Sequence, residues 1–311
     1  MTNNVNKCFV GIDVSKDKID ICVIPHNKSW TQSNSKFNAL VKKLSKYKPA
    51  LIPTGGYELG VFNSLTEAGF RVSREHAYKI HHHAKAMGKL AKTDKIDAGV
   101  IAHYAQCHCE KIEVTRVTKQ QLLLSDLVSR RNQLIKMQTQ EKNRLEKKDY
   151  SSQIQRSIKI ILKTVQKEIE RVDTKINNLI DSDEELKNKK EIVQTVMGIG
   201  NRVSTVIVAK LPELGRVDRK KIAALVGVAP YSKESGKLKR IQKTMGGRFE
   251  VRSALFMSTL SAIRHDSRFK NYYEKLIQKG KKKKVAIVAC LHKMLRILNA
   301  MLANNESYKS A

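Results

Sequence analysis

Residues 9–24 read FVGIDVSKDKIDICVI, and this stretch decides the fold of the first part of the chain. Residues 8–14 form an apolar run typical of a buried strand, and residues 19–24 alternate as its partner strand would. The polar residues 15–18 between them are typical of a turn. The stretch therefore predicts an antiparallel hairpin that carries one carboxylate, Asp13, inside its first strand.

The sequence after this hairpin alternates between helical and strand patterns. Helical patterns are predicted over residues 37–44 and near 58–68, a turn at 53–56, and a short strand at 70–72. Residues 81–105 are predicted to be helical or irregular. This order of elements predicts an α/β domain.

Residues 118–182 change character, because glycine and proline are absent and apolar residues recur every three or four positions. That spacing is a heptad seam, which predicts a coiled coil: two long helices folded as a hairpin or joined in a dimer. Two core helices of a bundle remain an alternative. The seam consists of Ile158, Leu162, Val165, Ile169, Val172, Ile176 and Leu179.

A third segment begins near residue 191 and is mainly helical to the end of the chain. It contains the turn Gly198-Ile-Gly200, followed by an apolar helix. Small residues before a helix N-terminus let backbone amides approach a phosphate, as in a helix-hairpin-helix motif. A plain tight turn is the alternative.

The charge of the chain favours a polyanionic partner. The 311 residues include 60 Lys and Arg against 29 Asp and Glu, a net charge of +31. A balance this basic disfavours a soluble metabolic enzyme and makes nucleic acid the expected partner. Because aromatic residues are only 5% of the chain, phosphate contacts should dominate over base stacking.

Cysteine usage and hydropathy indicate a reducing interior. Five cysteines are an odd number, and the N-terminus lacks the pattern of a signal peptide. Apolar runs are shorter than the roughly 18 residues of a membrane span. We therefore expect a cytoplasmic protein without membrane contact.

Three aspartates are candidates for metal chemistry. Asp13 would be buried by its apolar neighbours, so it should be paired, hydrogen-bonded or bound to a metal. Asp94 and Asp97 lie three residues apart, on one face of a helix. The three carboxylates together would suit Mg²⁺ and phosphodiester chemistry. A helix N-cap for Asp94 and a surface charge for Asp97 are the alternatives.

Two further clusters have simpler interpretations. The triplet His81–His83 is read as part of a solvated basic face, with metal or phosphate binding as the alternative. Cys107-His-Cys109 lacks a second pair of ligands and falls short of a zinc site.

Several motifs in order along the chain resemble the IS110/IS1111 transposase family. They are FVGIDVSK at 9–16, PTGGYE at 53–58, GKLAKTDKIDA at 88–98, MGIG at 197–200, ALVGVAP at 224–230, and SGK, GGR and VRSAL from residue 235 to 255. The resemblance implies three parts: a RuvC-like domain of RNase H fold over residues 1–115, a coiled-coil dimerisation segment over 116–190, and a mainly α-helical transposase domain over 191–311.

The same resemblance implies a set of four Mg²⁺-binding acids. Asp13 matches the first acid, and Asp94 and Asp97 match the last two. The family's second acid stands in a Glu-x-Thr-Gly motif, at the position that Ile52 occupies here. Glu58 is the nearby carboxylate that would replace it as a catalytic and metal-binding residue.

The C-terminal motifs imply a serine nucleophile and a phosphate-binding surface. Ser235 matches the family's serine, which forms a covalent link to DNA. Gly198 and Gly200 would contact the DNA backbone. The cations expected to neutralise phosphoryl oxygens are Lys237, Lys239, Arg240, Arg248 and Arg252.

The function expected from the resemblance is that of a DNA transposase or recombinase. Its partners would be the element's ends and its target DNA, a structured guide RNA, and further copies of the chain in a dimer or tetramer. It would work at the bacterial nucleoid. Two alternatives stay open: a nuclease of the RNase H or Holliday-junction type, and a nucleic-acid-binding remnant impaired by the missing acid at Ile52.

Overall fold

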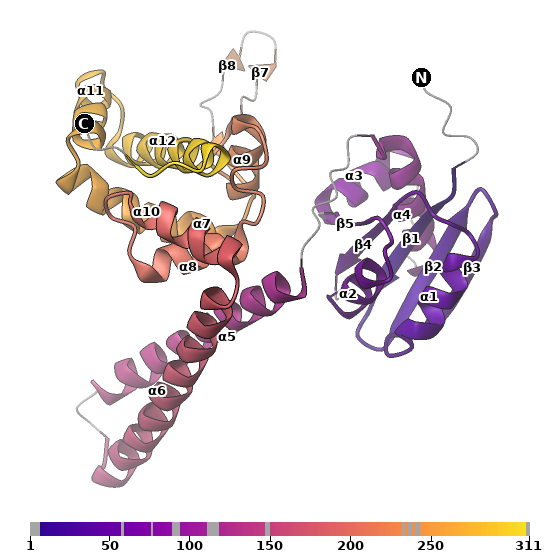
Figure 1. Ribbon diagram of the computed structural model, residues 1–311, viewed down its shortest axis with the longest axis horizontal. Helices are drawn as coiled ribbons and strands as arrows, with labels where there is room; N and C mark the ends of the chain where they lie inside the picture. The colour runs from indigo at the N-terminus through magenta and orange to yellow at the C-terminus, as the bar shows by residue number, and fades with distance from the viewer. Residues whose placement is uncertain are drawn as a thin grey trace. The chain divides into compact units, whose positions relative to one another are not determined.

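The computed structural model describes residues 7–56, 59–75, 77–88, 94–110, 118–146, 150–231, 234–235, 238–239 and 243–308. The chain divides into two compact units, Met1–Arg116 and Val117–Ala311. The first unit is a sheet covered by helices, and the second is mainly helical (Figure 1).

The first unit is built on a five-stranded sheet with the order β3-β2-β1-β4-β5. Its strands are β1 (Phe9–Val14), β2 (Lys18–Ile24), β3 (Lys28–Ser33), β4 (Ile52–Gly56) and β5 (Val72–Arg74). The pairs β1–β2 and β2–β3 are antiparallel, whereas β1–β4 and β4–β5 are parallel. The predicted hairpin is therefore confirmed, and it forms the centre and one side of the sheet.

Two strands differ from the sequence-based expectation. Residues 28–33 read KSWTQS, a polar segment with an edge strand's half-exposed pattern, and no strand was predicted there. Residues 53–56 were predicted to form a turn because they read PTGG, but they belong to β4. Backbone pairing with β1, Ile12 to Thr54 and Val14 to Gly56, overrides the local turn preference.

The helices of this unit cover both faces of the sheet. They are α1 (Phe37–Ser45), α2 (Leu59–Glu67), α3 (Ala77–Ala86) and α4 (Asp94–His108). The face under α1 and α2 carries the larger core, into which Val10, Ile12 and Val14 point. In Figure 1, α1 lies in front of this face. The other face of β1 is covered by α4, whose Tyr104 packs on Phe9.

Gly11 permits the close contact between α4 and β1. A Cβ atom at Gly11 would lie 2.1 Å from the carbonyl oxygen of Ala98 and 2.3 Å from the amide nitrogen of Ala102. Both atoms belong to the backbone of α4, so neither can move without moving the helix. Only glycine lets α4 lie this close to the strand that carries Asp13.

Gly11→Ala is predicted to destabilise the first unit by about 3 kcal/mol, because the added methyl group overpacks a rigid contact. Gly99→Ala is the matched control, since a Cβ there would meet the Cys22 sulfur at an ordinary 3.9 Å. That substitution should be neutral or should stabilise the helix by about 0.5–1 kcal/mol. Denaturant unfolding checks both variants, and equal stability would contradict this description of the contact.

The second unit begins with two long antiparallel helices, α5 (Lys119–Leu145) and α6 (Ser152–Asp181). The heptad seam of α6 is largely buried, and Val165, Ile169 and Val172 pack in one core with Leu124 and Leu134 of α5. Of the alternatives for the seam, the hairpin is therefore the one observed. The same core includes Val208, so the hairpin is joined to the helices that follow.

Those helices form a bundle around a second core. They are α7 (Glu184–Gln194), α8 (Asn201–Lys210), α9 (Arg219–Val226), α10 (Phe249–His265), α11 (Ser267–Gln278) and α12 (Lys283–Asn304). Helix α12 is long and apolar enough to cross a membrane by length and composition, with a mean hydropathy of 1.6 over 18 residues, although His292, Lys293 and Arg296 interrupt its apolar run. Its Cys290, Leu291, Met294 and Leu298 are buried in the bundle core, as in the central helix of a helical domain.

Candidate active site

Asp13 and Asp97 lie at the same end of the contact between β1 and α4. Helix α4 runs antiparallel to β1, because Phe9 at the start of the strand packs on Tyr104 near the end of the helix. The end of β1, where Asp13 stands, therefore lies beside the beginning of α4, where Asp97 stands. Asp13 points toward α4, since side chains alternate along a strand and Gly11 faces the helix. Both aspartates are partly exposed.

Asp94 is the first residue of α4, and the structure describes its backbone. It precedes Asp97 by three residues, so the two positions share a face of the helix. The predicted grouping of Asp13, Asp94 and Asp97 is therefore consistent with the fold at the level of the backbone.

Asp20 is a further carboxylate on this face that was not predicted from the sequence. It lies directly opposite Asp13 in the β1–β2 pair, and opposite residues in antiparallel strands share a face of the sheet. Asp20 is 96% buried and accepts a hydrogen bond from the Thr31 hydroxyl on β3. The sulfur of Cys22, two residues further along β2, would lie 3.9 Å from a Cβ at Gly99 of α4. Because residues two apart on a strand share a face, Asp20 also faces α4.

Ile52 points to the other side of the sheet. It is fully buried in the core under α1 and α2, together with Ile12 and Val72. A glutamate at this position would therefore enter an apolar core and would not meet Asp13. Glu58 lies outside the residues that the structure describes.

Ser235 lies in a small hairpin between α9 and α10. It belongs to β7 (Glu234–Ser235), which pairs with β8 (Leu238–Lys239) so that Ser235 is opposite Leu238. The outer pair, β6 (Pro230–Tyr231) and β9 (Lys243–Thr244), closes the base of the segment. In Figure 1, β7 and β8 project from the helices of the second unit. For Ser235 and Lys239 the structure describes the backbone.

Arg252 ties together the two ends of the segment that carries Ser235. Its Nη1 donates to the carbonyl oxygens of Gly227, at 3.3 Å, and of Gly246. Gly227 and Gly247 have positive φ angles and touch, since a Cβ at Gly247 would lie 2.2 Å from the Gly227 nitrogen. The hairpin therefore projects from a fixed base.

Arg248 is held by protein groups as well. Its guanidinium makes a bidentate ion pair with Glu213, at 2.5 and 2.6 Å, and donates to the carbonyl oxygen of Lys210 at 2.8 Å. The Glu213 side chain is only 11% exposed, so this pair is largely shielded from water. Of the other predicted cations, Lys237 and Arg240 lie outside the described residues.

The two glycines of the Gly198–Gly200 turn have different surroundings. Gly198 has a φ of +88°, and a Cβ there would lie 2.5 Å from the Ser258 carbonyl oxygen of α10. Its role is close packing. Gly200 is the N-cap of α8, and a Cβ there would have open space around it. The unsatisfied amides at the start of α8 are therefore approachable from the Gly200 side.

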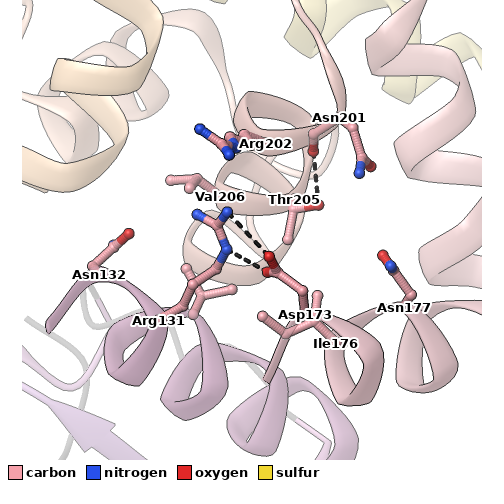
Figure 2. A pocket seen from close by; sticks show the side chains of 10 residues that line it. Arg131, Asn132, Asp173, Ile176, Asn177, Asn201, Arg202, Thr205 and Val206 are labelled. Carbon is pink, nitrogen blue, oxygen red and sulfur yellow. Dashed lines mark hydrogen bonds and ion pairs between the residues drawn. The ribbon is translucent and has the colours of Figure 1, made fainter. Parts of the chain in front are cut away.

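A polar pocket lies beside the first turns of α8, between that helix and the α5–α6 hairpin (Figure 2). Asn201, Arg202 and Thr205 of α8 line it. Arg131 of α5 and Asp173 of α6 form an ion pair at its floor, with Nη2 to Oδ2 at 3.3 Å. The pair joins the two long helices, and Arg202, two residues after Gly200, also lines the pocket.

The donor set of the first unit suits a hard divalent cation. Carboxylate oxygens are the ligands that Mg²⁺ prefers, and Asp13 and Asp97 approach from facing elements. Partial exposure of both leaves room for water and phosphate oxygens, which complete such a coordination shell. The residues present therefore fit a metal ion at this end of α4.

Comparison with known proteins gives the family. Residues 10–148 match a transposase family with a DEDD domain, and residues 190–274 match the family described as "Transposase IS116/IS110/IS902 family". Proteins named "Pilin gene-inverting protein" from Moraxella bovis and Moraxella lacunata are each 27% identical to this chain over 323 residues. The alignment covers 98% of this chain and 98% of each relative. Since both of its units match models of the same family, the chain belongs to the IS110/IS116/IS902 family of transposases.

Proposed function

We propose that this transposase exchanges DNA strands by forming a covalent bond between Ser235 and DNA, with Mg²⁺ held by carboxylates of a RuvC-like, RNase H-type domain. The observation that carries the proposal is the antiparallel packing of α4 on β1, which brings Asp97 to the end of the strand where Asp13 stands. The mixed sheet, with an antiparallel β1–β2–β3 half and parallel β4 and β5, supports the RNase H-type assignment.

The metal-binding set would consist of Asp13, Asp94 and Asp97, with Asp20 beside them. Asp20 takes the place of the acid that the family has at position 52, because it faces α4 and Ile52 does not. Glu58 remains the other candidate for that place. When bound, Mg²⁺ supplies a Lewis acid for a phosphoryl oxygen and for the attacking hydroxyl. The protein's part is to hold its carboxylates at fixed positions on a strand and a helix.

The proposed reaction is a pair of transesterifications. The Oγ of Ser235 attacks phosphorus, a P–O bond to a sugar oxygen breaks, and the displaced oxygen leaves as a hydroxyl after taking up a proton. The serine proton passes to a carboxylate or to water. In the second step a sugar hydroxyl of another strand attacks the phosphoserine and restores Ser235. The number of phosphodiester bonds is conserved, so the exchange needs no external energy source.

The basic residues near Ser235 would serve in two ways. Arg252 and Arg248 fix the base of the hairpin through the carbonyls and the carboxylate that they contact, and so position Ser235. Lys237, Lys239 and Arg240 would neutralise the phosphoryl oxygens during attack. Gly200 and Arg202 would hold a DNA phosphate at the start of α8, while Gly198 maintains the turn.

The α5–α6 hairpin, within residues 116–190, would also carry the contact between protomers. Its heptad seam is buried inside the chain, so a contact between protomers would use another surface of the hairpin. Three isoleucines of the outer half of α6 are exposed: Ile154 by 46%, Ile160 by 61% and Ile161 by 41%. Ile154 and Ile161 are seven residues apart and share a face of α6, and exposed apolar side chains on one face favour contact with a further copy, in a dimer or tetramer.

The net charge of +31 is large enough for both DNA and a structured guide RNA. Purified at moderate salt from cytoplasm, the protein should carry one predominant RNA, encoded by the non-coding end of its own element. Recombination of a plasmid bearing the element ends should then require that RNA. Ribonuclease treatment followed by addition of the transcribed RNA is the control. Full activity after ribonuclease treatment would exclude RNA guidance and leave the serine chemistry untouched.

A further inference from the structure

A second cluster of metal-binding side chains lies between α3 and α4, away from the carboxylates. The cluster includes His83 of the histidine triplet and Cys107 of the Cys-His-Cys segment. Neither motif by itself predicted a metal site. With His103, their ligand atoms all lie within 4.8 Å of one another. His103 and Cys107 are four residues apart on α4 and therefore share a face, and His83 reaches them from α3.

The separations are close to those of a tetrahedral zinc site. The Nε2 of His83 is 2.9 Å from the Nδ1 of His103, and the Cys107 sulfur is 3.7 Å from that Nδ1. Ligands at 2.0–2.1 Å for nitrogen and 2.3 Å for sulfur would stand about 3.3 and 3.6 Å apart around a tetrahedral ion. The two imidazoles need to separate by a few tenths of an ångström. The sulfur is also 3.8 Å from Nε2 of His103, so a side-chain rotation is needed before it faces the Nδ1 lone pair.

The chemistry of the three groups selects a transition metal of the zinc class. Two imidazoles and a thiolate are borderline-soft ligands, whereas Mg²⁺ prefers oxygen. Cys107 is exposed, so its thiol proton can leave to solvent on binding and a water molecule can take the fourth position.

We propose that His83, His103 and Cys107 bind one Zn²⁺ ion, which ties α3 to α4. His103 follows Asp97 by six residues, about 9 Å along the helix, so this ion and the carboxylate-bound metal are separate. The zinc site would fix the helix on which Asp97 and Asp94 stand. Its role is structural: it holds the catalytic helix in place and takes no part in the reaction.

Cobalt(II) titration of the full-length protein tests the site. The protein is prepared without a histidine tag, treated with a chelator and kept reduced. One Co²⁺ per chain should produce the visible absorption of tetrahedral cobalt together with a thiolate charge-transfer band, and Zn²⁺ should displace it. His83→Ala and Cys107→Ser should each weaken binding by at least about 100-fold. His82→Ala is the matched control, because His82 is an exposed neighbour on α3.

Thermal unfolding gives a second measurement. Zinc at 100-fold above its dissociation constant should raise the unfolding temperature of the wild-type protein by about 5 °C and that of Cys107→Ser by much less. Cys107→Ser changes one exposed atom, so this variant should fold normally without metal. The proposal is overturned if tetrahedral cobalt does not form, or if its spectrum and the zinc stabilisation persist in both His83→Ala and Cys107→Ser.

Discussion

Ser235→Ala is expected to reduce strand exchange at least about 10⁴-fold and to abolish the protein–DNA adduct that survives SDS. Alanine has no oxygen with which to form the phosphodiester bond to DNA. If water attacked instead, the DNA would be hydrolysed, and the energy of the broken phosphodiester bond would not be kept for rejoining the strands. Binding of DNA should stay within about twofold of wild type, because the basic surfaces are unchanged. Plasmid recombination, SDS gel electrophoresis and a binding titration at one salt concentration measure the three effects.

Ser232→Ala is the matched control, since it removes a hydroxyl from the same segment, three residues from Ser235. It should recombine DNA at nearly the wild-type rate. If the Ser235→Ala protein still exchanges strands, or if Ser232→Ala is the inactive variant, the assignment of the nucleophile is wrong. Mg²⁺-dependent nicking without any adduct in the wild-type protein would favour the nuclease alternative.

Asp97→Asn should lower DNA strand cleavage by about 10³-fold while leaving DNA binding intact. Asparagine keeps the size of the side chain but removes the charge that would face the metal and Asp13. The rate of adduct formation, measured across a Mg²⁺ titration, separates a loss of metal affinity from a loss of DNA affinity. The unfolding midpoint of the variant should match the wild type, because Asp97 is partly exposed.

Two further aspartates of the β1–β2 hairpin sharpen this test. Asp17→Asn, in the exposed turn, should have no effect on cleavage. Asp20→Asn keeps an oxygen to accept the Thr31 hydrogen bond, yet it should raise the Mg²⁺ concentration needed for half-maximal cleavage about tenfold or more. An unchanged Mg²⁺ requirement in Asp20→Asn would remove Asp20 from the metal-binding set. Full activity of Asp97→Asn would remove the carboxylate mechanism itself.

The β1–β2 hairpin and α6 were predictable from the sequence because their apolar patterns are local. Residues 9–24 alternate or run apolar over a short distance, and the α6 seam repeats regularly over about six turns. Strand β3 was not predictable, since an edge strand with polar residues has the pattern of a loop. Pairing with β2 forms it, and that partner is known only from the fold.

The composition of the site depends on which face of the sheet each residue occupies. The sequence alone could not predict which face α4 covers. Asp20 lies between Ile19 and Ile21, which is the pattern of a solvent-facing polar residue, but α4 covers its face. Ile52 and Leu51 are neighbours in the chain, yet their side chains lie on opposite faces of the sheet. Ile52 packs in the core under α1 and α2, and Leu51 packs in the core under α4. His83 and His103 are 20 residues apart, so only the packing of α3 on α4 brings them together.

Identification of the residue that is bonded to DNA tests the central claim most directly. Wild-type protein is incubated with Mg²⁺, its RNA and a DNA substrate nicked near the cleavage site, so that the released strand diffuses away and the adduct accumulates. The adduct is digested with nuclease and protease and analysed by mass spectrometry. The mechanism predicts a nucleotide attached through phosphate to Ser235. Cleaved DNA whose ends carry no peptide, from a protein that is active in recombination, would contradict it.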